Sequence, residues 1–213
     1  MNKNLTELVF ILDRSGSMHS LTAETIGGFN SLVEKQKKDG NAYLTTVLFD
    51  NNCETLHNHV DIQKVPILTN NEYYACGSTA LLDAVGQTID SIGHRLAQTP
   101  EEERPGKVIF TITTDGQENA SKEYTLERVK EMITHQRNVY NWEFVFLGAN
   151  IDAVQTAGSL GISPMMAKTY SATPTGCRST YHVMDKLLNY MKRNDAASDD
   201  FEEECSSILS QVE

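Results

Sequence analysis

Five apolar residues in an unbroken run, Leu8-Val9-Phe10-Ile11-Leu12, constrain the fold more than any other feature of the sequence. A strand with one face in water alternates apolar and polar residues, so an unbroken run predicts a strand covered on both faces. Residues 107–114 predict a second buried strand, and residues 142–147 predict a third. Helices must therefore cover both faces of a central sheet.

Amphipathic patterns alternate with these strands along the chain. Apolar residues at helical spacing predict helices around residues 26–33, 81–96, 126–133, 152–159 and 183–191. Further strands are expected at residues 42–49, 53–60 and 165–170, of which 53–60 is an antiparallel edge strand behind the turn at 50–52. The alternation predicts an α/β fold with three α/β/α layers, doubly wound and Rossmann-like, with a mostly parallel sheet and one antiparallel edge strand.

Charge and cysteine content restrict the environment and the partners. The chain has 18 Lys and Arg against 29 Asp and Glu, a formal net charge of −11 that repels nucleic acid and anionic lipid. No apolar run approaches the ~20 residues of a membrane span, and residues 1–7 have no signal-like apolar core. The four scattered cysteines are expected to be free thiols. We therefore expect a cytoplasmic protein with no nucleic-acid partner and no membrane association.

The last residues differ in composition from the rest of the chain. A length of 213 residues suits one domain, expected at residues 5–193, followed by an acidic tail at 194–213. From Asp195 onward there are seven acidic residues and no basic ones. This composition favours a solvated or frayed end, although Ile208, Leu209 and Val212 leave room for a short docking helix.

Oxygen-bearing side chains follow the predicted strands where these end. Asp13, Ser15 and Ser17 come directly after the first strand, and Gly16 between them allows sharp curvature. Thr79 precedes the helix at 81–96, and Asp115 ends the strand at 107–114. The carboxyl ends of parallel strands meet at one edge of a sheet, where ligands of such folds bind. These donors are the type that Mg²⁺ prefers, so the sequence predicts a divalent-cation site.

The three elements Asp13-x-Ser15-x-Ser17, Thr79 and Thr114-Asp115-Gly116, in this order, resemble the von Willebrand factor type A (VWA) domain with its metal-ion-dependent adhesion site (MIDAS). The resemblance covers roughly residues 5–193, and the compact layout is similar to bacterial stand-alone intracellular members of this family. It implies that Ser15 and Ser17 ligate Mg²⁺ or Mn²⁺ directly. It also implies that Asp13 and Asp115 act largely through water, and Thr79 either directly or through water.

These ligand types suggest a binding function. Neutral hydroxyls leave a divalent cation under-neutralised, with a coordination position open to an external carboxylate. We therefore expect a metal-dependent protein-binding module whose partner presents Asp or Glu to the cation, and no catalytic residues.

The alternative is a Mg²⁺-dependent hydrolase or phosphatase at the same strand ends. Phosphate-transfer enzymes of the haloacid dehalogenase type also place an Asp after a first parallel strand, but they carry Asp-x-Asp, and position 15 here is Ser. The sequence also has no phosphate-binding loop, nucleophile elbow or His-Glu-x-x-His motif.

Several neighbours of the motif have two possible roles. Tyr73, Tyr74 and His19 could lie on the rim of the site, and a structural role for either tyrosine is an equal alternative. Asn119 and Ser121 are expected to cap a helix and not to ligate. His57-x-His59 is expected to lie on the surface face of the edge strand.

Overall fold

The computed structural model describes residues 1–213 and contains one central six-stranded sheet. The strands are β1 (Asn2–Asp13), β2 (Ala42–Phe49), β3 (Cys53–Asp61), β4 (Pro105–Thr114), β5 (Glu143–Ala149) and β6 (Ala167–Tyr170). Their order is β3-β2-β1-β4-β5-β6, and only β3 pairs antiparallel, at one edge. The predicted mostly parallel sheet with an antiparallel edge strand is therefore confirmed.

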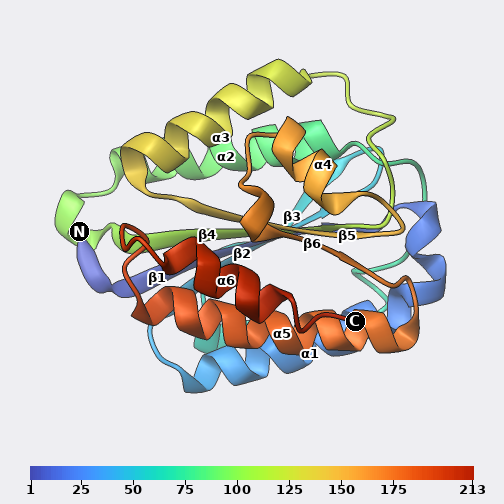
Figure 1. Ribbon diagram of the computed structural model, residues 1–213, viewed down its shortest axis with the longest axis horizontal. Helices are drawn as coiled ribbons and strands as arrows, with labels where there is room; N and C mark the ends of the chain where they lie inside the picture. Colours follow the sequence, from blue (N-terminus) through green and yellow to red (C-terminus); the bar gives the residue numbers. More distant parts are fainter.

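Helices cover both faces of this sheet (Figure 1). They are α1 (Thr22–Lys38), α2 (Leu81–Gln98), α3 (Leu126–Tyr140), α4 (Ala153–Ser159), α5 (Pro174–Arg193) and α6 (Phe201–Leu209). Helices α1 and α5 pack side by side on one face, and α2 and α3 lie on the other. The predicted three-layer α/β/α fold is confirmed. No helix is both long and apolar enough to cross a membrane.

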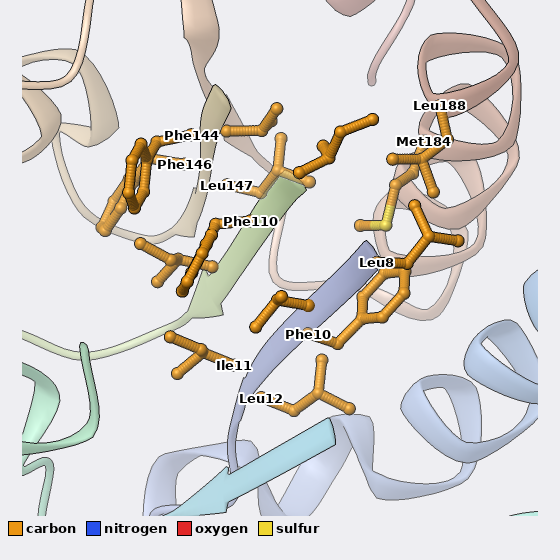
Figure 2. Packing of buried hydrophobic residues seen from close by; sticks show 14 of the residues in the cluster. Leu8, Phe10, Ile11, Leu12, Phe110, Phe144, Phe146, Leu147, Met184 and Leu188 are labelled. Carbon is orange, nitrogen blue, oxygen red and sulfur yellow. The ribbon is translucent and has the colours of Figure 1, made fainter. Parts of the chain in front are cut away.

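The core lies on both sides of β1, as the unbroken apolar run predicts. Its five apolar residues at positions 8–12 are each at most 1% exposed. Phe10 meets Phe29 of α1 edge to face, with ring centroids 5.6 Å apart, whereas Phe110 stacks on Phe144 at 4.7 Å. Figure 2 shows Met184 of α5 on the Phe10 side of the sheet and away from Phe110. An apolar layer thus packs on each face of the sheet. The ends of the strands lie outside these layers and carry polar side chains.

Residues after Asp195 correct one expectation. Helix α6 packs against α5, and Phe201, Cys205, Leu209 and Val212 are buried in the main core. A solvated or frayed end is therefore wrong for these residues, and the docking helix is what forms. Within α6, Glu203 and Glu204 stay exposed on the outer face of an amphipathic helix. The acidic residues Asp195, Asp199, Asp200 and Glu213 lie before or after this helix.

The edge strand β3 departs from regular alternation. Its pairing with β2 shifts register on both sides of Thr46, and His59 adopts a left-handed backbone with φ 52°. His57 on this strand is buried, so its expected surface position is wrong. Such bulges redirect side chains locally, which a period of two residues cannot anticipate.

Candidate metal-binding site

The five candidate residues lie at the carboxyl edge of the sheet. Asp13 is the last residue of β1, Ser15 follows as the N-cap of a 3₁₀ helix (Gly16–Leu21), and Ser17 lies in the first turn of that helix. Asp115 comes directly after β4, the neighbour of β1. Thr79 lies two residues before α2. Three segments that are distant in sequence therefore bring their side chains to one edge of the sheet.

Asp13 is fully buried, and both of its carboxylate oxygens accept hydrogen bonds. Oδ1 accepts from the backbone N–H of Ser15 at 2.6 Å, and Oδ2 accepts from the hydroxyl of Thr114 at 2.6 Å. Thr114 reaches Asp13 because β1 and β4 pair with Leu12 opposite Thr113. The orientation of this carboxylate is thus set by the neighbouring strand. Thr114 has a supporting role that sequence reasoning missed, since the adjacency of these strands is not visible in the sequence.

Three hydroxyl groups gather beside Asp115. The Oγ atoms of Ser15 and Ser17 are 3.1 Å apart, and the Ser17 hydroxyl donates to Asp115 Oδ1 at 2.5 Å. A Cβ atom added at Gly116 would lie 2.9 Å from Thr79 Oγ1 and 3.7 Å from Ser17 Oγ. Gly116 therefore keeps open the space into which the hydroxyls of Ser17 and Thr79 point.

The two carboxylates of the site have no basic partner. Burial raises the pKa of Asp13, and the nearby charge of Asp115 raises it further, against the lowering effect of the hydrogen bonds from Thr114 and Ser15. Burial also raises the pKa of Asp115. The one Arg in the loop, Arg14, forms its ion pairs elsewhere, with Asp50 and Glu54. A cation between these carboxylates would therefore supply the charge that the chain does not.

The donor set fits a hard divalent cation. It consists of three hydroxyls and two carboxylates, all oxygen donors. No group of three or more His, Cys, Asp or Glu lies close enough together to hold a metal ion. A metal at this edge would consequently depend on Ser15, Ser17 and Thr79 in addition to the two acids.

The loop between β4 and α3 forms hydrogen bonds to Thr79 and to the start of α2. Asn119 Oδ1 accepts from the N–H of Thr79 at 2.9 Å, and Glu118 Oε2 accepts from the N–H of Leu82 at 2.9 Å. Ser121 Oγ accepts from the N–H of Asp83 at 3.0 Å. Ser121 thus caps a helix as expected, but that helix is α2, which precedes it, and not α3. Asn119 bonds the backbone of Thr79, which lies before α2, so the expected helix-capping role of Asn119 is wrong. The bonds to Leu82 and Asp83 satisfy backbone groups that a helix start leaves free.

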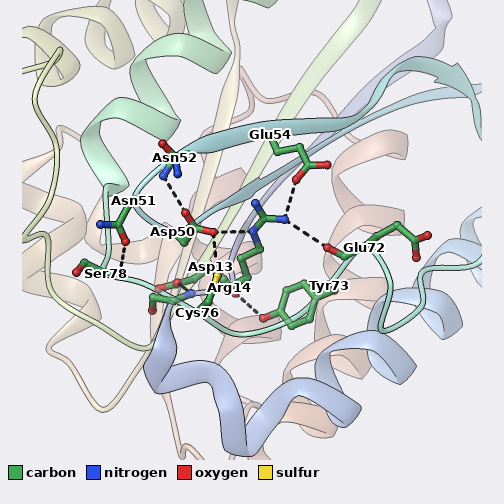
Figure 3. Close-up of polar contacts among 11 residues, drawn as sticks. Asp13, Arg14, Asp50, Asn51, Asn52, Glu54, Glu72, Tyr73, Cys76 and Ser78 are labelled. Atoms are coloured by element: carbon green, nitrogen blue, oxygen red, sulfur yellow. Dashed lines mark hydrogen bonds and ion pairs between the residues drawn. The ribbon is translucent and has the colours of Figure 1, made fainter.

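The tyrosine pair divides into one structural and one exposed residue. Tyr73 is fully buried, and its hydroxyl donates to the carbonyl oxygen of Asp13 at 2.5 Å (Figure 3). Tyr74 is 51% exposed. His19 is also exposed. Of the three rim candidates, Tyr73 therefore has a structural role, because it binds the backbone of Asp13.

Comparison with solved structures identifies the fold. No protein-family model and no curated protein matches this sequence. The vWF domain of the type V pili tip protein Mfa5 from Porphyromonas gingivalis superposes with a TM-score of 0.64 at 10% identity, over 91% of this chain and 98% of that one. The chain has the VWA fold.

Two further structures with this fold are described with a metal. Proximal thread matrix protein 1 from the mussel byssus, with a zinc-occupied MIDAS motif, has a TM-score of 0.60 at 17% identity, over 86% of this chain and 46% of that one. The manganese-loaded TRAP protein of Plasmodium vivax has a TM-score of 0.59 at 17% identity, over 80% of this chain and 70% of that one.

The likeness at such identities concerns the VWA fold alone. This chain also spans only about half of some of these proteins, with 46% of proximal thread matrix protein 1 and 61% of the PilB minor pilin from Streptococcus sanguinis covered.

Proposed function

We propose that this protein is a metal-dependent protein-binding module. In this proposal Asp13, Ser15, Ser17, Thr79 and Asp115 hold a divalent cation, Mg²⁺ or Mn²⁺, and a partner protein contributes an Asp or Glu side chain to it. The observation that carries the proposal is the gathering of three hydroxyls against two buried carboxylates that lack any basic partner.

The chemistry of the donors supports the choice of cation and of ligand. Oxygen-only donor sets favour Mg²⁺ and Mn²⁺ over softer metals. When bound, the cation supplies positive charge that attracts an external carboxylate. The chain's own contribution is to hold the donors: Thr114 and the Ser15 N–H orient Asp13, and Asn119 holds the backbone of Thr79. The two metal-loaded proteins with this fold support a divalent cation at this edge.

We propose binding in preference to hydrolysis at this site. A nucleophilic Asp needs an oxygen that is free to reach a substrate. Asp13 is fully buried and both of its oxygens accept short hydrogen bonds. This occupancy supports a role in holding the site and not in attack on a substrate. We extend the proposal to a cytoplasmic location, which is supported by four cysteines that stay unpaired in the fold.

Titration calorimetry with MgCl₂ and MnCl₂ tests the cation site. We expect binding by the wild-type protein and its loss in Ser15→Ala, which removes one donor and leaves Asp13 in place. Ser20→Ala, an exposed serine in the same 3₁₀ helix, is the matched control and should bind like the wild type. Equal affinity in Ser15→Ala and wild type would contradict the proposed site.

Affinity capture from a lysate, with Mg²⁺ or with EDTA, tests the partner. We expect a protein that is retained with Mg²⁺, lost with EDTA and lost with the Ser15→Ala variant as bait. Replacing acidic residues of that protein by their amides should then abolish retention. If every retained protein persists in EDTA, the metal-dependent mechanism is wrong. Turnover of phosphatase or esterase substrates that disappears in Asp13→Asn would instead favour the enzyme.

A further inference from the structure

The segment that carries Thr79 has no helix or strand of its own. Residues 65–80 run from the end of a short 3₁₀ helix (Ile62–Lys64) to the start of α2, with only turns and bends between. Backbone in such a segment is ordered only by the contacts it makes with its surroundings. The position of Thr79 in the site therefore depends on what holds residues 65–80 against the sheet.

Arg14 makes the central contacts between this segment and the strand ends (Figure 3). Its guanidinium is buried; Nε donates to Asp50 Oδ2 at 3.0 Å and Nη1 donates to Glu54 Oε2 at 2.8 Å. Nη1 also donates to the backbone carbonyl of Glu72 at 3.3 Å, and the guanidinium carbon lies 5.2 Å from the ring centre of Tyr74. One side chain thus joins the ends of β1 and β2 to residues 72–74.

Backbone bonds around Arg14 complete the connection. The N–H of Cys76 donates to the carbonyl of Arg14 at 2.8 Å. The N–H of Ala80 donates to the carbonyl of Asp50, also at 2.8 Å. Thr79 therefore lies between two residues whose backbone is bonded to Arg14 and to its ion-pair partner.

The chemistry of Arg14 suits a positioning role. A planar guanidinium can serve several acceptors at once, whereas a lysine ammonium concentrates its charge at one point. Arg14 and Asp50 are both almost completely buried, and buried charges are tolerated only when they are paired. Because its charge is already paired with Asp50 and Glu54, Arg14 leaves the carboxylates of the site free for a cation.

We infer that Arg14 is a positioning residue of the proposed cation site, which holds the Thr79 segment in place without touching the cation. This inference rests on the proposed function. It assigns a role to Arg14, which lies between Asp13 and Ser15 in the motif and which the sequence analysis did not consider.

A double-mutant cycle measured by Mg²⁺ calorimetry tests this role. We expect Arg14→Lys to bind Mg²⁺ roughly tenfold more weakly than wild type, as is typical when a residue supporting a metal ligand is replaced. If Arg14 acts through Thr79, the double variant Arg14→Lys/Thr79→Ala should bind no more weakly than Thr79→Ala alone. Arg128→Lys, at a side chain 60% exposed on α3, is the matched control and should leave the affinity unchanged.

Hydrogen exchange without added metal gives a second readout. Amides of residues 65–79 should exchange faster in Arg14→Lys, while amides of β1 and β4 stay protected. If Arg14→Lys loses protection in every strand, the substitution destabilises the whole protein. The variant Glu54→Gln, which removes one charged partner of Arg14, then tests the positioning role. The Glu54 side chain is 52% exposed, so the protein should stay folded, with a roughly two- to fivefold loss of Mg²⁺ affinity.

The outcomes separate the two proposals. If the wild type takes up no Mg²⁺ or Mn²⁺, the proposed function fails. If the wild type binds, Ser15→Ala does not, and Arg14→Lys and Glu54→Gln both bind like the wild type, only the role of Arg14 is overturned. Fully additive losses in the double variant would also overturn it, because they would mean that Arg14 does not act through Thr79.

Discussion

Tyr73 connects the apolar core to the candidate site through a single hydroxyl group. Its ring is fully buried, and burial raises its pKa well above the ordinary value, so the hydroxyl stays protonated and donates to the Asp13 carbonyl. Directly beside it, Tyr74 turns its ring outward, next to Arg14. Two identical neighbours thus have opposite roles, which composition cannot distinguish.

Removing the Tyr73 hydroxyl should destabilise the protein. Tyr73→Phe keeps the buried ring but leaves the Asp13 carbonyl without this donor, so we expect a loss of about 1–3 kcal/mol in the free energy of unfolding. Tyr74→Phe is the matched control and should change it by less than about 0.5 kcal/mol, as is usual for exposed sites. Urea denaturation measures both; equal effects of the two variants would contradict the structural role of Tyr73.

At the scale of elements, the close packing of α1 and α5 depends on one of two adjacent glycines. A Cβ atom added at Gly28 would lie 2.2 Å from the Tyr181 ring of α5, whereas one added at Gly27 would meet nothing within 4 Å. Both glycines lie inside α1, where glycine is intrinsically unfavourable. Gly28 therefore provides space for the neighbouring helix, and Gly27 does not.

The two alanine variants should shift stability in opposite directions. We expect Gly27→Ala to raise the free energy of unfolding by about 0.5–1 kcal/mol through helix propensity. We expect Gly28→Ala to lower it by about 1–3 kcal/mol, because Tyr181 must move out of a well-packed position. Thermal denaturation of both variants checks this. Stabilisation by Gly28→Ala would show that the helices can separate freely.

Most helices and strands could be predicted from the sequence, but some contacts between them could not. Unbroken apolar runs and helical periodicity predicted β1, β4, β5 and the helices on both faces, because these patterns follow from burial of each segment by itself. The register shifts of β3, the burial of His57 and the bonds from Asn119 to Thr79 and from Ser121 to α2 were not predicted. Each depends on how a segment packs against another one.

At the scale of the whole molecule, a half-buried carboxyl group, that of Glu143, lies at the amino edge of the sheet close to a charge of α6. Glu143 begins β5, and burial raises its pKa from 4.5 to about 7. The charge of Arg137 lowers that pKa, that of Glu202 on α6 raises it, and that of Lys107 lowers it. Arg137 and Glu202 form an ion pair at 2.8 Å. Helix α6 thus places a like charge, that of Glu202, near Glu143.

Stability should therefore depend on pH through Glu143. Below about pH 4.5 this carboxyl is protonated in both states; between 4.5 and 7 the unfolded chain releases the proton and the folded protein keeps it. The stabilising contribution is present at low pH and is lost as pH rises through about 7. Glu143→Gln should raise the free energy of unfolding near pH 8 by roughly 1–3 kcal/mol and change it little near pH 4.5.

Urea denaturation across this pH range measures the effect. Glu203→Gln, an exposed residue of α6, serves as the control for removal of a negative charge and should not reproduce the pH dependence. A Glu143→Gln variant that follows the wild-type profile at every pH would show that Glu143 does not titrate in this way.

The sequence by itself determined the layers of this protein and the residue types at its strand ends. Burial on both faces requires unbroken apolar runs, and a helix packed on a sheet requires a 3.6-residue period; both are local properties of the chain. The five candidate residues could be named for the same reason, although their binding of a cation stays a prediction.

Only the tertiary structure decided which distant groups meet. The order of the strands places Thr114 against Asp13, buried Arg14 joins Asp50 to residues 72–74, and core burial docks α6 despite its acidic composition. Each of these contacts joins residues far apart in sequence. Their formation depends on the packing of the whole chain, which no local pattern records.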